Sequence, residues 1–291
     1  VPTQLAAALT EGTKAQLTDA IEKGAVGVIL MTETISGEPF AFNMALDEHS
    51  YKGTPILVLG SAHKSSLKDL LTSDEIIQLQ INGAYEDRFT WNVIGRMDRR
   101  GDDVVVVSTP RTGWFRSGAE RGPGVALFLE FAKWIAENGD ADLVFVGTGG
   151  HEIGHVGMQA FLAEKAPSPQ RTSLWVHLGA SIAAYNWQTP EQRTVGAEVP
   201  QNAETRWIIY SGNLSFQAWR QFSGLAYQHS PGYLSAFGEA KDIRAAGYPR
   251  FFAFAGWHPY FHLPSDDALN TSGDLLIPTG EALAALIEPH L

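Results

Sequence analysis

The sequence has no cysteine among its 291 residues, which excludes disulfide bonds, thiolate nucleophiles and cysteine-bound zinc. Long hydrophobic runs are also missing. The longest, such as Val104 to Val107 and Leu143 to Val146, have the length of a strand and fall far below the ~20 residues of a membrane-spanning helix. Residues 1–10 lack the charged region and apolar core of a signal peptide. We therefore expect no membrane span, and nothing in the sequence indicates a compartment.

Positive charge is scarce. Lys and Arg number 21 against 32 Asp and Glu, so the formal net charge is -11. Lys and Arg form no run, whereas nucleic-acid binding usually needs a basic surface. We expect a small-molecule or peptide substrate and no nucleic-acid partner. The oligomeric state has no signal in the sequence.

The hydrophobic pattern predicts two units, residues 1–87 and residues 88–291. In the first, strands are expected at 25–31, 55–59 and 76–81 and helices at 17–23 and 61–71. In the second, short apolar segments alternate with amphipathic ones. The strands expected there are 89–97, 104–108, 143–147, 174–178, 206–210 and 251–254, and the helices are 124–136, 156–164, 216–227 and 280–287. This alternation predicts an α/β fold with a mostly parallel central sheet flanked by helices, and a small α/β unit beside its active edge.

Parallel sheets bind ligands at the carboxyl ends of their strands. The loops that follow Val107, Val146, Leu178 and Phe254 are therefore where chemistry is expected.

One of these loops contains His151-Glu152-Ile153-Gly154-His155, which fits the zinc motif H-E-x-x-H. That motif needs a helix that places both histidines on one face. Here a strand ending in Gly149-Gly150 precedes it, and glycine at 154 and 157 weakens a helix. The zincin interpretation is therefore disfavoured, and His155 is expected to be structural.

Several short segments, taken in their order along the chain, together resemble the M28 metallopeptidase family of the zinc-aminopeptidase type. They are Asn92-Val93-Ile94-Gly95, Gly124-Val125-Ala126, Phe145 through Gly154, Gly247-Tyr248-Pro249 and His262-Leu263-Pro264-Ser265-Asp266. Residues 14 to 82 resemble the protease-associated (PA) domain that often accompanies this family. The resemblance implies a PA-like domain at 1–87 and a peptidase-like catalytic domain at 88–291.

The family holds two zinc ions with five side chains. Three of these ligand positions fall on Glu120, Glu152 and His262, and the resemblance therefore implies one zinc or other divalent metal at these residues. The two private ligands of the other metal fall at about Thr109 and at Gly179, so the second site is expected to be lost.

The catalytic Glu of the family falls on His151, next to Glu152. Imidazole titrates near neutrality and can take a proton from water. The catalytic residues implied by the resemblance are therefore His151 and Glu152, and His151 is alternatively a metal ligand.

Arginines and aromatic residues accompany these positions. Arginine binds carboxylates and phosphates with two parallel hydrogen bonds, so the arginines near Glu120 indicate either an anionic substrate or ion pairs with Glu120 and Glu152. The residues expected to contact the substrate are Arg111, Arg116, Arg121, Trp114, His177, Trp257 and Tyr260, with Phe261 in the same aromatic pocket.

Three functions remain open. The first is a single-metal hydrolase that cleaves an amide or related bond of a small substrate. The second is a metal-independent enzyme, a lyase, isomerase or hydrolase, in which His151 and Glu152 act as an acid–base pair. The third is a catalytically inactive, peptidase-like binding protein.

Overall fold

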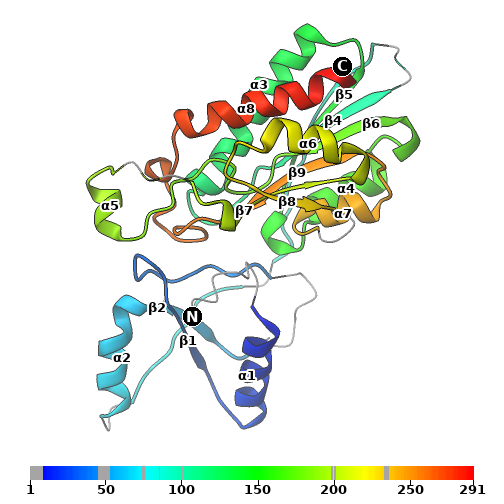
Figure 1. Cartoon of the computed structure of the whole chain (residues 1–291). Coiled ribbons are helices and arrows are strands. Elements are labelled where there is room, and N and C mark those ends of the chain that lie inside the picture. Colours follow the sequence, from blue (N-terminus) through cyan, green and yellow to red (C-terminus); the bar gives the residue numbers. More distant parts are fainter. Residues whose placement is uncertain are drawn as a thin grey trace.

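A computed structural model describes residues 9–44, 53–73, 76–84, 86–99, 101, 103–197, 199, 201–232 and 236–291. Residues 1–8, the start of the expected first unit, lie outside the described residues. The chain forms a small unit and a larger unit; in Figure 1 the small unit lies below the larger one.

The described residues of the small unit form helices α1 (Glu11–Glu22) and α2 (Lys64–Leu71) and strands β1 (Val28–Thr32) and β2 (Ile56–Gly60). The two strands pair in parallel, with Val28 opposite Ile56. The strand expected at 76–81 does not form, and Ile76 is 97% exposed. The apolar residues of this segment therefore pair with no strand.

The larger unit is built on seven strands in the order β3-β5-β4-β6-β9-β7-β8. They are β3 (Val93–Met97), β4 (Val104–Pro110), β5 (Asp142–Thr148), β6 (Thr172–His177), β7 (Arg206–Tyr210), β8 (Gln228–Pro231) and β9 (Phe251–Gly256). Neighbouring strands are parallel except at the β3–β5 and β7–β9 pairs. The predicted α/β class with a mostly parallel central sheet is confirmed.

Helices cover both faces of this sheet (Figure 1). The helices of the large unit are α3 (Gly118–Asn138), α4 (Val156–Glu164), α5 (Pro190–Thr194), α6 (Ser215–Phe222), α7 (Glu239–Ala245) and α8 (Gly273–Ile287). Alternate residues of β4 point to opposite faces, as a pleated strand requires. Val105 packs in one core with residues of α3, α6 and α8, and Val106 packs in the other with residues of α4 and α7.

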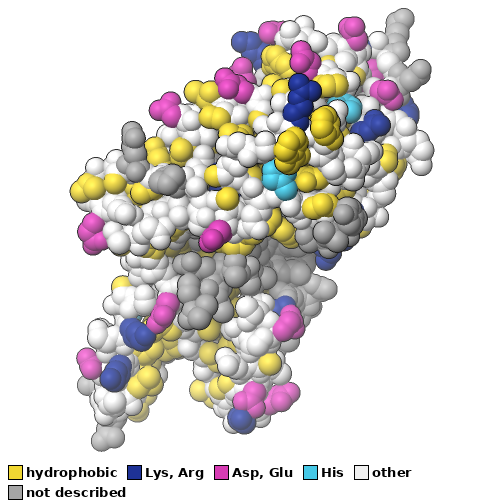
Figure 2. Space-filling view, viewed as in Figure 1, with side chains coloured by type: hydrophobic (Ala, Val, Ile, Leu, Met, Phe, Trp, Pro, Cys, Tyr) yellow, Lys and Arg dark blue, Asp and Glu magenta, His cyan; other side chains and the backbone are white. Residues whose placement is uncertain are grey.

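Charged side chains of both signs are spread over the surface. Figure 2 shows acidic and basic side chains scattered over the visible face without a large patch of either sign. Among the described residues, no helix has the length and apolar character to cross a bilayer.

The core of the α3–α6–α8 face gives a stability prediction. Leu283 is fully buried, so Leu283→Ala removes packed methyl groups and leaves a cavity. We expect the free energy of unfolding to fall by about 2–5 kcal/mol, measured by urea denaturation. The matched control is Leu269→Ala, because Leu269 is 63% exposed; its effect should stay under about 0.5 kcal/mol. Equal unfolding midpoints for the two variants would contradict this packing.

Candidate functional site

A cavity of about 480 Å³ opens where the loops that follow the parallel strands meet. Its walls are largely apolar and include several aromatic side chains, and a few polar side chains lie among them. The aromatic residues are Trp207, Phe237, Phe254, Trp257 and Phe261, and the polar ones are Arg121, His151, His177 and Glu239. An apolar pocket with a few convergent polar groups is the usual form of a small-molecule site.

His151 contacts a carboxyl group that the sequence did not indicate. Its Nδ1 lies 3.1 Å from Oε1 of Glu239, the first residue of α7. Thr148, at the end of β5, donates its hydroxyl to Glu239 at 3.0 Å. Glu239 is fully buried. These contacts pair the largely enclosed His151 with the fully buried Glu239 at the carboxyl end of the sheet.

Burial dominates the protonation of this pair. It raises the pKa of Glu239 above the usual range. It also lowers the pKa of His151 well below the usual value, and the nearby Arg121 guanidinium lowers it further. Both shifts favour the uncharged form, because a low-dielectric site penalises charge. His151 is therefore neutral at pH 7 and able to accept a proton.

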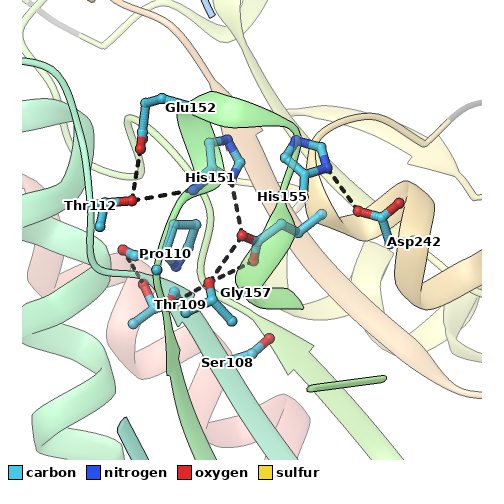
Figure 3. Close-up of polar contacts among 12 residues, drawn as sticks. Ser108, Thr109, Pro110, Thr112, His151, Glu152, His155, Gly157 and Asp242 are labelled. Carbon is cyan, nitrogen blue, oxygen red and sulfur yellow. Dashed lines mark hydrogen bonds and ion pairs between the residues drawn. The ribbon is translucent and has the colours of Figure 1, made fainter. Parts of the chain in front are cut away.

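Glu152 faces a different set of partners. The hydroxyl of Thr112 donates to Glu152 Oε2 at 2.7 Å, and Thr112 also accepts a hydrogen bond from the backbone N–H of His151. Figure 3 shows Thr112 between the two residues. The acid that contacts the His151 side chain is therefore Glu239 and not Glu152, its neighbour in the sequence.

His155 pairs with an acidic side chain of helix α7. Its Nδ1 lies 2.7 Å from Asp242 Oδ2 on α7, a contact visible in Figure 3. Its ring lies 4.6 Å from that of His151, centroid to centroid. The H-E-x-x-H histidines do not share a helix face, because a short 3-10 turn covers 151–153 and α4 begins after His155.

His177, at the end of β6, also lines the cavity. Its Nδ1 lies 2.9 Å from the Ser108 hydroxyl, which accepts a hydrogen bond from the Trp175 indole. Burial lowers the pKa of His177 to about 4. Burial therefore keeps this side chain neutral, and the Ser108 contact fixes its position at the end of β6.

Two of the carboxylates predicted to bind metal lie on either side of Arg121. Arg121 Nη2 is 2.9 Å from Glu120 Oε1 and also 2.9 Å from Glu152 Oε1. Burial lowers the pKa of Arg121, but the two carboxylates raise it by more, so the net shift is upward. Burial raises the pKa of Glu120, and Arg121 with His262 lowers it by more. Glu120 and Arg121 are thus a buried ion pair.

His262, the third predicted ligand, lies at the same place. Its Nε2 is 3.3 Å from Glu120 Oε1, and its Nδ1–H donates to the Ala41 carbonyl at 2.7 Å. Ala41 belongs to the small unit, whose Met44 N–H also donates to the Glu152 carbonyl. The small unit therefore contacts two of the three predicted metal ligands.

A zinc ion does not fit these residues as they stand. The guanidinium of Arg121 already lies between Glu120 and Glu152 within hydrogen-bond distance of both. A divalent cation bound to the same oxygens would meet a buried positive charge at short range, where repulsion amounts to several kcal/mol. Within the described part of the chain, no three His, Asp or Glu side chains are arranged to hold a metal ion.

The remaining predicted substrate contacts divide into two groups. Arg121, His177 and Trp257 line the cavity, together with Phe261. The others are occupied elsewhere in the structure. Arg111 donates to the Trp91 carbonyl, Arg116 lies 3.9 Å from Asp267, the Trp114 indole donates to Asn43, and Tyr260 is buried beneath Arg193.

Sequence reasoning missed Glu239 and Thr112. Gly238-Glu239-Ala240 opens a helix that Gly247 follows, and an acidic residue in a first turn is a common helix signal. That signal predicts a helix but also predicts a solvated carboxylate. The burial of Glu239 depends on the strands and loops that cover it, which lie far away in the sequence.

No protein-family model and no curated protein matches the sequence. A zinc aminopeptidase from Bacillus subtilis superimposes with a TM-score of 0.65 at 16% identity, covering 97% of this chain and 67% of that chain. An M28 peptidase precursor from Shewanella amazonensis gives 0.68 at 16% identity, covering 95% of this chain and 62% of its own.

A glutaminyl cyclase from Porphyromonas gingivalis gives a TM-score of 0.52 at 12% identity, over 69% of this chain and 76% of that chain. The chain therefore has the fold of the M28-type zinc aminopeptidases, as the sequence resemblance predicted, and spans about two thirds of their length. Identities this low relate folds, so the chemistry must be argued from the side chains.

The buried His177 predicts how stability depends on pH. With a folded-state pKa of about 4, His177 stays neutral below pH 6.5, where the unfolded chain already binds a proton. The unfolded state binds more protons between these values, so stability falls as pH drops from 6.5 to about 4. This residue should contribute about 3 kcal/mol to that loss. His177→Gln should flatten the decline in unfolding free energy, measured by denaturation at several pH values.

The exposed His63 gives the control. His63→Gln should leave the wild-type pH dependence unchanged. A His177→Gln profile parallel to wild type would show that His177 does not carry this dependence.

Proposed function

We propose that this chain is a metal-independent hydrolase that cleaves an amide or ester bond of a small molecule, with His151 as general base. The observation that carries the proposal is the His151–Glu239 pair in the wall of the aromatic cavity, beside the Arg121 guanidinium. The aminopeptidase-like fold is consistent with this reaction class but does not by itself supply it.

His151 and Glu239 have separate roles in this reaction. When Nδ1–H donates to Glu239, Nε2 is the nitrogen that takes a proton from a water molecule as that water attacks the carbonyl carbon. Glu239 accepts this hydrogen bond and holds the ring in this tautomer. The proton then passes from Nε2 to the leaving nitrogen or oxygen as the bond to the carbonyl carbon breaks. General acid–base catalysis of this kind contributes about 10²–10⁴-fold to the rate.

Arg121 supplies the positive charge near the reacting carbonyl. It lines the cavity, and its Nη1 is buried without a hydrogen-bond partner among the described residues. A fixed donor in a water-poor site stabilises the oxygen that becomes negative in the transition state. Two carboxylates already balance this guanidinium, so we favour a neutral carbonyl over the anionic group considered from sequence.

The walls restrict the substrate. Trp207 and Trp257 lie 4.5 Å apart, centroid to centroid, and Phe237 and Phe261 complete an apolar surface. A volume of about 480 Å³ accepts a drug-sized or dipeptide-sized molecule. We therefore expect an aromatic or branched apolar group on the acyl side or the leaving group.

The single-metal hydrolase has less support, because Arg121 lies between two of its three ligands.

Variants of the pair test the proposal. On a panel of chromogenic amides and esters with aromatic acyl groups, wild type should retain its turnover in excess chelator. His151→Gln should lower kcat/KM by about 100-fold or more, because no base remains. Glu239→Gln should lower kcat by roughly 10-fold or more with little change in KM, because the amide can present its NH2 to Nδ1 and no longer fixes the tautomer of the ring.

The controls are His63→Gln and Glu204→Gln, whose parent side chains are exposed and outside the cavity. Both should keep wild-type rates. The proposal fails if chelator removes activity and zinc restores it, if His151→Gln stays fully active, or if wild type hydrolyses nothing in the panel.

A further inference from the structure

The cluster of Glu120, Arg121, Glu152 and His262 has a property that the proposed reaction does not require. Arg121 and Glu120 are each almost wholly enclosed, with exposed side-chain fractions of 6% and 0%. His262 has none of its side chain exposed. A cation at this depth persists only with compensating anions, and Arg121 has two, contributed by α3 and by the loop after β5.

The acceptors around Arg121 are not saturated. Within the described residues, both carboxylate oxygens of Glu120 and the Nε2 of His262 are buried without a hydrogen-bond partner. The close approach of Arg121 to Glu120 is thus electrostatic and lacks hydrogen-bond geometry. Because His262 uses its Nδ1–H on Ala41, its Nε2 is left directed at Glu120. Two carboxylates and an imidazole nitrogen converge on a place that holds one monovalent cation.

We propose that the Arg121 guanidinium is a tethered replacement for a divalent cation, and that Glu120, Glu152 and His262 form a latent zinc site closed by this one side chain. Oxygen and nitrogen donors of this kind are the set that zinc accepts. With Arg121 in place, Glu152 is held by the guanidinium and by Thr112. Without it, Glu152 can turn toward Glu120 and His262, and the vacated volume admits an ion and a water.

The residue at position 121 decides whether the site is closed by a guanidinium or open to a metal ion. Its guanidinium reaches both carboxylates from a backbone position next to Glu120 on the first turns of α3. No other described side chain is paired with both carboxylates. A neutral side chain at 121 would leave two buried carboxylates without a counter-charge, which a divalent ion would then supply.

Zinc binding by chelator-stripped protein tests this inference without any measurement of turnover, so it stands or falls apart from the proposed reaction. Zinc content is measured by mass spectrometry after dialysis, and affinity by competition with a chromogenic zinc indicator. Wild type should retain less than about 0.1 zinc per chain. Arg121→Ala should bind about one zinc per chain, at least 100-fold more tightly than wild type, as expected for a three-ligand site.

Two further variants separate the effect of the guanidinium charge from the effect of the volume that the Arg121 side chain fills. Arg121→Lys keeps a cation near the carboxylates and should bind no more zinc than wild type. The triple variant Arg121→Ala, Glu120→Gln, Glu152→Gln opens the same volume without the acidic ligands and should also bind none. Circular dichroism establishes that each variant is folded, and the midpoint of thermal unfolding of Arg121→Ala should rise when zinc is added.

Three results would overturn the inference. One is stoichiometric zinc in wild type with the affinity of Arg121→Ala, which would mean that the guanidinium does not exclude the ion. Another is a folded Arg121→Ala that binds no zinc. The third concerns an Arg121→Ala variant that is unfolded in chelator. Zinc should then restore its circular dichroism spectrum. The inference is overturned if zinc does not restore it although the triple variant folds.

Discussion

The buried ion pairs of Arg121 with Glu120 and Glu152 are the constraint on which the site depends. Moving any of these charges out of water costs several kcal/mol, and that cost is offset only while all three stay together. Glu120 and Arg121 lie on α3, whereas Glu152 lies in the loop after β5. The network therefore fixes that loop against the helix and, with it, the position of His151 at the cavity.

The small unit contributes to the same constraint from the other side. Its residues Ala41 and Met44 bond to His262 and to the Glu152 backbone, and Asn43 accepts from the Trp114 indole. The contacts of Ala41 and Met44 use their backbone carbonyl and amide groups, so the identities of these two residues hardly reveal them. The unit thus takes part in building the site, a role that its two-stranded sheet alone would not suggest.

Local apolar patterns made much of the fold predictable. The helix at 156–164 and the strand at 206–210 have the predicted bounds, because each is a compact apolar segment that the sheet buries. The strand expected at 76–81 failed for the opposite reason: β propensity is realised only against a neighbouring strand. Strand β8 and helix α7 were missed because their sequences, Gln228–Pro231 and Glu239–Ala245, are too polar or too short to carry a clear period.

The sequence predicted the site only as far as the resemblance assigned its side chains to the metal-ligand positions of the zinc peptidases. Arg121 Nη2 lies 2.9 Å from both Glu120 and Glu152, and His262 Nε2 lies 3.3 Å from Glu120, so the three positions named by the resemblance lie around one guanidinium. The sequence could not say which cation they surround, because a metal ion and a guanidinium attract the same donors. Arg121 was visible in the sequence as one of three arginines near Glu120. Its burial and its pairing with both carboxylates distinguish it from Arg111 and Arg116. A set of carboxylate and imidazole ligands therefore predicts a positive charge at its centre. The fold determines whether that charge is a metal ion bound from solvent or a side chain such as Arg121.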